Sequence, residues 1–270
     1  TKRNHLSTLM LLQEFKKDIT FSDLTFEFVS SFEYFLQLKG YHTNTIAKHM
    51  KHLKRHVNIA INKEYIEIQK YAFRKYKIKT VENKHTHLVP EELEKLEKLN
   101  LSGRYMKLQK SLDAFLFCCY AGMRYSDFTN LSSENIVDIN QETWLIYKSV
   151  KTGTEVRLPL YLLFAGKGII ILNKYRDNLE GFFRLRDNSN VNKDLLTLAK
   201  LAGLSKNISF HTARHTNATL LIYNGVNITT VQKLLGHKSV KTTQVYTNIM
   251  DMTIIHDLEK MKQATPFAGK

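Results

Sequence analysis

The chain has 270 residues, 43% of them hydrophobic, and it carries 40 basic and 25 acidic side chains, for a formal net charge of +15. This length suffices for two domains, and the hydrophobic fraction excludes a chain that is disordered throughout. The excess of positive charge favours a polyanionic partner, and nucleic acid is the obvious one. A merely soluble basic protein is the alternative that composition leaves open.

The sequence shows no signal peptide and no long apolar span. The run over residues 161–172 is too short to cross a membrane and is interrupted by glycine and lysine. We interpret the adjacent Cys118 and Cys119 as small core residues of a cytosolic protein, because neighbouring cysteines rarely bridge each other without strain. The chain begins with Thr1 rather than Met, which is compatible with a fragment that lacks an upstream domain.

Residues 1–82 are predicted to form a helical domain. The spacing of apolar residues predicts helices over 5–17 and 25–38, the second ending at Gly40. A third helix is predicted from Thr43, its expected N-cap, to about residue 61. Its apolar stripe consists of Ile46, Met50, Leu53, Val57 and Ile61.

The other faces of this third helix are basic. No acidic residue between 46 and 61 balances them, so contact with DNA phosphates is favoured over a merely solvated helix surface. The candidate DNA-binding side chains are Lys48, Lys51, Lys54 and Arg55. Three of them, Lys48, Lys51 and Arg55, follow spacings of three and four and form one stripe.

A polar segment, residues 83–88, is predicted to link this domain to a second one over residues 89–270. Pro90 suits the first turn of a helix there. Further helices are predicted over residues 105–120, 193–202, 211–223, 229–235 and 253–261. A hairpin is predicted in which 144–148 pairs with 156–159 around a turn at 151–154. The expected fold is therefore mainly α with a small antiparallel β-sheet.

Five short stretches of the chain bring together cations, imidazoles and a phenol. Together they supply two arginines, a lysine, two histidines and a tyrosine. This set suits an attack on a phosphodiester without a metal, because guanidinium groups can neutralise the transition state and a tyrosine oxygen can be the nucleophile. The stretches are GMRYSD (122–127), VKTGTEVRLPL (150–160), HTARHT (211–216), LLGH (234–237) and QVYT (244–247).

The order Arg, Lys, His-x-x-Arg, His, Tyr in these stretches resembles the tyrosine recombinase (phage integrase) family. The chain is most similar to integrases of bacterial mobile elements, and the likeness runs from about residue 5 to about residue 260. The resemblance implies a helical core-binding domain followed by an α+β catalytic domain. It also implies a site-specific recombinase that cuts and rejoins DNA through a 3′-phosphotyrosine intermediate, without metal, ATP or another cofactor.

When the catalytic roles of the family are assigned to the matching positions of this sequence, the resemblance implies that Tyr246 is the nucleophile. His211 would assist proton transfer at the tyrosine. Lys151, at the tip of the hairpin turn, would protonate the leaving 5′ oxygen as general acid. Lys148 competes with Lys151 for this role.

The resemblance also makes Arg124 and Arg214 the two phosphate clamps, and His237 a donor to a non-bridging oxygen. Asp127 is interpreted as a partner or cap rather than a catalytic base. His215 lies four residues after His211, a spacing that can chelate zinc. No cysteine or carboxylate near them supplies a third ligand, so we favour a buried, hydrogen-bonded support residue over a metal ligand.

The implied partners are double-stranded DNA and three further protomers, which would form a tetramer on two duplexes in the bacterial cytoplasm, with accessory DNA-bending or excision factors. Residues 253–261 form an amphipathic segment that would dock on a neighbouring protomer or pack on its own. Two other functions stay open. A type IB topoisomerase uses nearly the same residues, and a catalytically silent DNA-binding protein is the non-enzymatic alternative.

Overall fold

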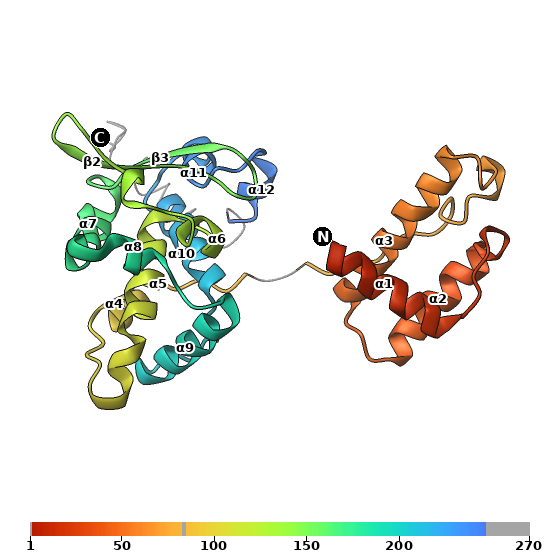
Figure 1. The fold of residues 1–270 in the computed structure, drawn as a ribbon, viewed down its shortest axis with the longest axis horizontal. Coiled ribbons are helices and arrows are strands. Elements are labelled where there is room, and N and C mark those ends of the chain that lie inside the picture. The colour runs from red at the N-terminus through yellow and green to blue at the C-terminus, as the bar shows by residue number, and fades with distance from the viewer. Residues whose placement is uncertain (1, 83–84, 247–270) are drawn as a thin grey trace, which may run out of the picture. The chain divides into compact units, whose positions relative to one another are not determined.

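The computed structural model describes residues 2–82 and 85–246, which form two compact units, Thr1–Lys84 and His85–Lys270 (Figure 1). The division falls inside the predicted linker, 83–88. Residues 85–88 nevertheless pack on the second unit. Leu88 is fully buried there, and its N–H donates to Thr216 Oγ1 at 2.9 Å.

The first unit is helical in its described part, as predicted. Its α-helices are α1 (Lys2–Phe15), α2 (Phe26–Leu38) and α3 (Thr43–Asn62), with short 3₁₀ turns at Phe21–Asp23 and Ile68–Lys70. Their apolar faces enclose a core that includes Phe28, Val29, Phe32, Leu36, Met50, Leu53 and Val57.

The predicted capping of α3 is wrong by one residue. Thr43 is the first helical residue, and the N-cap position belongs to His42, whose side chain makes no capping hydrogen bond. Helix α2, in contrast, has a conventional cap, because Thr25 Oγ1 accepts a hydrogen bond from the N–H of Phe28.

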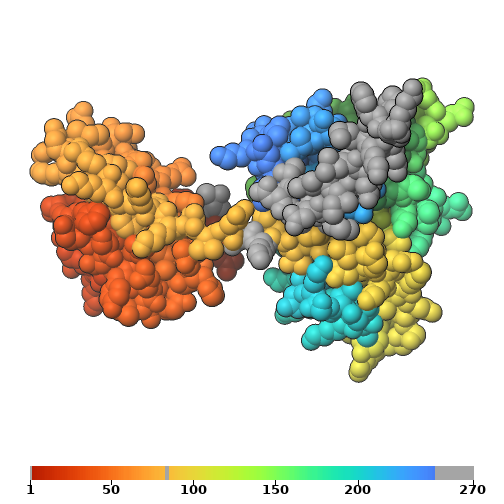
Figure 2. Space-filling model, turned by 180° about the vertical axis from the view of Figure 1, so that it is seen from behind, coloured from red at the N-terminus to blue at the C-terminus, as the bar shows by residue number. Residues whose placement is uncertain are grey.

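The second unit is built around α5. From Ser111 to Ala121 every residue of this helix is buried, including the free Cys118 and Cys119, as expected for a helix that is covered on all sides. Helices α4, α7, α8, α9 and α10 contact it, and α4 and α9 reach the outer surface (Figure 2). The α-helices are α4 (Pro90–Glu97), α5 (Gln109–Ala121), α6 (Tyr125–Phe128), α7 (Lys167–Lys174), α8 (Leu179–Phe183), α9 (Asn188–Leu201), α10 (Phe210–Tyr223), α11 (Ile228–Leu234) and α12 (Lys241–Gln244).

The helix predicted over 105–120 is α-helical only in its later part. It starts as a 3₁₀ segment, Gly103–Leu108, before α5 begins. The segment predicted to be helical over 253–261 lies outside the described residues. Within the described residues, no helix is long and apolar enough to cross a membrane.

The sheet has three antiparallel strands in the order β1 (Ile136–Ile139), β2 (Glu142–Lys148) and β3 (Glu155–Pro159). The β2–β3 hairpin confirms the prediction, and its register places Lys148 opposite Glu155. Strand β1 was not predicted. It joins β2 through Asn140 and Gln141, both in the left-handed region with φ of 53° and 67°, as a two-residue hairpin turn requires. The fold is therefore mainly helical with a small antiparallel sheet, as the sequence predicted.

Candidate active site

A buried arginine joins the ends of three helices in the second unit. Arg214 lies in α10, is only 1% exposed, and donates hydrogen bonds to the carbonyl oxygens of Gly122 at 2.8 Å and Leu235 at 2.6 Å. These two residues cap the C-termini of α5 and α11. Carbonyl groups at helix C-termini lack intrahelical partners and carry partial negative charge, so they hold the guanidinium in a fixed position.

Gly122 is required at the first of these contacts. Its φ of +66° lies in the left-handed region, and a Cβ atom there would stand 2.6 Å from Asn217 Oδ1 and 2.8 Å from Leu235 Cδ2. The glycine thus ends α5, as predicted. It also lets α5 approach α10 and α11 closely enough for its carbonyl to reach Arg214.

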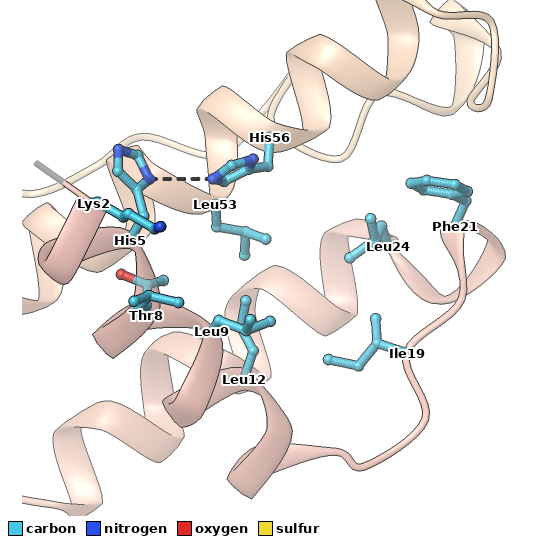
Figure 3. Close-up of a pocket in the computed structure, with 11 residues that line it drawn as sticks. Lys2, His5, Thr8, Leu9, Leu12, Ile19, Phe21, Leu24, Leu53 and His56 are labelled. Atoms are coloured by element: carbon cyan, nitrogen blue, oxygen red, sulfur yellow. Dashed lines mark hydrogen bonds between the residues drawn. The ribbon is translucent and has the colours of Figure 1, made fainter.

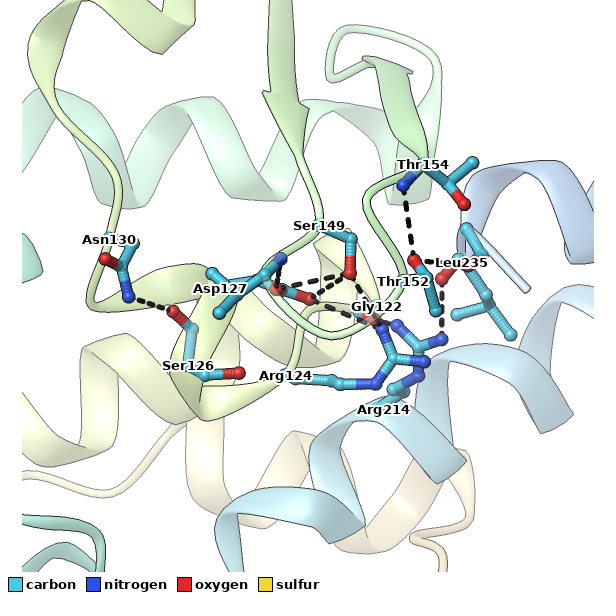
Figure 4. A network of polar contacts seen from close by, with 12 residues as sticks. Gly122, Arg124, Ser126, Asp127, Asn130, Ser149, Thr152, Thr154, Arg214 and Leu235 are labelled. Atoms are coloured by element: carbon cyan, nitrogen blue, oxygen red, sulfur yellow. Dashed lines mark hydrogen bonds and ion pairs between the residues drawn. The ribbon is translucent and has the colours of Figure 1, made fainter. Parts of the chain in front are cut away.

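Arg124, the N-cap residue of α6, is held by a small polar network (Figure 4). Its Nη1 lies 3.4 Å from Asp127 Oδ2 and 3.3 Å from Ser149 Oγ. The side chain of Asp127 is fully buried and also accepts the N–H of Val150 at 2.9 Å. Asp127 therefore acts as the partner of Arg124, as predicted, and ties it to the β2–β3 hairpin.

The guanidinium groups of Arg124 and Arg214 lie next to each other (Figure 4). Burial, and then the charge of Arg124, lowers the pKa of Arg214 to about 10. The effect of Arg124 is the response of one cation to another, because like charges disfavour each other's ionised form. Two guanidinium groups beside the single carboxylate of Asp127 leave a net positive charge that suits an anion such as phosphate.

Lys151 is exposed in the turn between β2 and β3. The turn is anchored at Thr152, whose Oγ1 donates to the carbonyl oxygen of Gly236 at 3.3 Å. The charge of Lys151 contributes to the lowered pKa of both His211 and His237, so its ammonium acts on the same region as the two arginines.

His237 and Tyr246 lie with parallel rings, 6.5 Å apart at an interplanar angle of 3°. Both are buried, at 8% and 6% exposure. Burial, followed by the charges of Arg214 and Arg124, lowers the pKa of His237 to about 3, so the imidazole is neutral near pH 7. Its Nδ1 is hydrogen-bonded to Thr243 Oγ1 at 2.9 Å.

The pKa of Tyr246 is under opposing influences. Burial raises it, and the charges of Arg214 and Arg124, together with a hydrogen bond from Arg214, act to lower it. The net direction is upward, so the phenol keeps its proton near pH 7. Attack by its oxygen requires that this proton be removed as the bond to phosphorus forms.

His211 and His215 share one face of α10, with ring centroids 4.5 Å apart. His211 is exposed, although partial burial and the charges of Arg214 and Arg124 lower its pKa. His215 is buried, as predicted, but its Nδ1 has no hydrogen-bond partner among the described residues, so the predicted hydrogen-bonded role is not met at that atom. No described group of three or more His, Cys, Asp or Glu side chains is placed to hold a metal ion.

All six predicted catalytic side chains thus meet in one region of the second unit. The sequence predicted Asp127 as the partner of Arg124, but it did not reveal three further residues that hold the site. Ser149 supports Arg124, Thr152 supports the Lys151 turn, and Thr243 supports His237. Thr152 contacts a carbonyl 84 residues away, and no local pattern signals such a contact.

The predicted DNA-binding residues lie on α3 in the first unit. Lys48, Lys51 and Arg55 are exposed, as the stripe requires. Lys54 is half-buried, with Nζ 6.0 Å from the centre of the Phe73 ring. The three side chains of the stripe are therefore open to solvent, whereas Lys54 lies partly covered near an aromatic ring.

The histidines of α3 face α1 instead. His49 is 1% exposed and hydrogen-bonded to Thr8 Oγ1 at 2.8 Å. Beside them lies an apolar cavity of about 420 Å³ (Figure 3), with His5 Nδ1 3.2 Å from His56 Nε2 at its edge. Of the described residues that line this cavity, none is a candidate catalytic or DNA-binding side chain.

The fold resembles that of solved recombinase structures. A lambda integrase fragment, in a crystal structure of a dimer bound to a COC′ core site, matches with a TM-score of 0.73 over 90% of this chain and 86% of that one. The two sequences are 19% identical, so this likeness concerns the fold alone.

Curated relatives extend the likeness to the sequence. A tyrosine recombinase of Pseudothermotoga lettingae is 31% identical over 185 residues, which are 65% of this chain and 60% of that protein. The tyrosine recombinase XerD of Oceanobacillus iheyensis is 25% identical over 269 residues, 92% of this chain and 86% of the relative.

Two family descriptions match successive parts of the chain. Residues 1–78 match the phage integrase SAM-like domain, and residues 87–252 match the phage integrase family. The second match spans more than half of the chain and includes every candidate catalytic residue. This chain belongs to the phage integrase family.

Proposed function

We propose that this chain is a site-specific DNA recombinase that cuts and rejoins DNA through a covalent bond between Tyr246 and a 3′ phosphate. The observation that carries the proposal is the position of the Tyr246 ring, which is parallel to the His237 ring at 6.5 Å between centroids and lies under the electrostatic influence of Arg214 and Arg124. This position supports the proposal that Tyr246 is the nucleophile and that the two arginines bind the phosphate it attacks. Membership of the phage integrase family supports the same activity.

In the proposed cleavage, the Tyr246 oxygen attacks phosphorus while its proton passes towards His211. The bond from phosphorus to the 5′ oxygen breaks, and Lys151 protonates that oxygen. The products are a 3′-phosphotyrosyl bond and a 5′ hydroxyl. Because one phosphodiester replaces another, the bond energy is retained and ATP is not needed. The 5′ hydroxyl of a partner strand then reverses these steps and joins the new strand.

The arginines would stabilise the charge that develops on phosphate. Arg214 is held by two carbonyl oxygens before the reaction, and donors fixed in advance cost no reorganisation at the transition state. His237 is neutral and would donate from Nε2 to a non-bridging oxygen. This assignment requires Nδ1 to accept a hydrogen bond from Thr243, with which it is paired.

The proposed partners are double-stranded DNA and further copies of this chain. Exchange between two duplexes cuts four strands, so four protomers are needed, each with one Tyr246. Accessory DNA-bending or excision factors belong to the same proposal. The SAM-like first unit, with its basic stripe on α3, favours this function over relaxation of supercoils by a type IB topoisomerase.

The nucleophile can be tested by Tyr246→Phe, which removes only the attacking oxygen. The variant should bind DNA like the wild type, and the covalent adduct on a nicked suicide substrate should fall to background on a denaturing gel. Tyr147→Phe is the matched control, because Tyr147 is also buried and its hydroxyl has no partner among the described residues. An adduct that persists in Tyr246→Phe excludes this residue as the nucleophile.

The general acid can be tested with a leaving group that needs no proton. Lys151→Ala should slow cleavage of an ordinary phosphodiester by roughly 10²- to 10⁴-fold, the usual contribution of general acid catalysis. It should cleave a 5′-bridging phosphorothiolate at nearly the wild-type rate. Lys148→Ala, a change at the end of β2, is the control. Rescue by sulfur in Lys148→Ala but not in Lys151→Ala would assign the role to Lys148.

The basic stripe can be tested through the salt dependence of binding. Removal of a single phosphate contact should flatten the log–log slope by about 0.9. Replacing Lys48, Lys51 and Arg55 by alanine should therefore weaken binding and give a slope about 2 to 3 units shallower in mobility shifts over a salt series. The fold should persist, because the apolar face of α3 is unchanged.

A control variant for the stripe removes the same charge elsewhere in the first unit. Lys16, Lys39 and Lys70 each form an ion pair with a carboxylate and are replaced together by alanine. We expect a smaller change of slope in this control. Equal slopes in the two triple variants would show that the stripe makes no phosphate contacts of its own.

A further inference from the structure

Four aromatic rings follow one another through the candidate active site, and the middle pair, His215 and Tyr246, is tilted by 53°. His85 and His215 are stacked, with centroids 4.5 Å apart at 24°. The ring of Tyr246 follows at 5.4 Å from His215, and that of His237 at 6.5 Å from Tyr246. Three of these residues come from the motifs that suggested the function, whereas His85 comes from the segment that the sequence placed in the linker.

His215, one of the middle pair, is held by ring packing. Its Nδ1 is buried and has no hydrogen-bond partner among the described residues. Its ring contacts are His85 on one face, His211 at an interplanar angle of 78°, and Tyr246. The position of this ring therefore depends on its neighbours, and His85 provides the stacked contact.

The segment that carries His85 is anchored to the second unit. The N–H of Leu88 donates to Oγ1 of Thr216, the residue that follows His215 in α10. The carbonyl oxygen of His87 accepts a hydrogen bond from Lys206 Nζ at 3.1 Å. Leu88 itself is fully buried. These contacts fix the backbone close to His215. The ring of His85 is therefore carried by an anchored segment and not by a free surface loop.

Tyr246 lies outside regular secondary structure, so its position depends on the side chains packed around it. It lies two residues beyond α12, a helix of only four residues, and its N–H donates to the carbonyl oxygen of Thr243 at 3.0 Å. In-line attack requires the oxygen to approach phosphorus along a narrow range of directions, and a small misplacement of a reacting group slows a reaction strongly.

On the basis of the proposed function, we propose that His85 is a positioning residue for strand cleavage, which stacks on His215 and thereby keeps the Tyr246 ring aligned with the scissile phosphate. His85 does not touch the phosphate. It acts through His215, and its ring matters as an aromatic surface rather than as a base.

The test is single-turnover cleavage of the nicked suicide substrate at saturating enzyme. His85→Ala should lower the cleavage rate by about 2- to 10-fold, the effect expected when one aromatic pair is removed. DNA affinity should be unchanged. His85→Phe should restore the rate, because a phenyl ring can stack but cannot titrate. Thr86→Ala, a change at the exposed neighbouring position, should cleave like the wild type.

A double-mutant cycle separates positioning through His215 from a general loss of structure. In a His215→Ala background, the further change His85→Ala should have no additional effect, since the stacked pair is already absent. Fluorescence of Trp144, the single tryptophan of the chain, reports whether the second unit is folded in each variant.

Three results would overturn the inference. The first is a wild-type rate in His85→Ala, and the second is a failure of folded His85→Phe to recover activity. The third is a cleavage rate in the double variant that falls by the product of the two single-variant losses, as it would if His85 and His215 acted independently. In each case adduct formation by the wild type leaves the proposed function standing. A wild-type chain that forms no adduct would overturn the proposed function, and this inference with it.

Discussion

The candidate active site depends on one buried cation. Arg214 is almost fully buried, and a buried guanidinium is tolerated only where acceptors replace the water removed from it. Gly122 and Leu235 supply those acceptors from the ends of α5 and α11. The same two hydrogen bonds bring three helix ends together, and the loops that carry Arg124 and His237 begin at those ends. Stability of the unit and geometry of the site thus rest on the same contact.

The two candidate catalytic histidines add no positive charge to the site near neutral pH. The pKa of His237 is lowered to about 3 and that of His211 also lies below its usual value, so both imidazoles are neutral donors or acceptors at pH 7. The cationic side chains of the site are the two arginines and Lys151, and the carboxylate of Asp127 lies beside Arg124. Two guanidinium groups side by side suit an anion such as phosphate, because an anion between them would offset their mutual repulsion.

Local patterns in the sequence predicted what local physics determines. Apolar spacing and capping residues located most helices, Gly122 marked the end of α5, and the turn residues placed Lys151 at the tip of a hairpin. The sequence did not predict strand β1, because its four residues form a strand only through their pairing with β2. It also could not show that His85 belongs to the second unit or that Thr152 reaches Gly236. Those contacts join residues far apart in the chain, and no repeating pattern in the sequence indicates them.

The paired arginines are proposed to form a binding site for a phosphoryl group. The most direct test is thermal unfolding of the full chain, followed through Trp144, with increasing orthovanadate at constant ionic strength. A ligand that binds only the folded state raises the melting temperature with its concentration. We expect such a rise in the wild type and in Lys51→Ala, a control in the first unit, and its loss in Arg124→Ala. No rise in the wild type, or an equal rise in Arg124→Ala, would show that the paired arginines do not form this binding site.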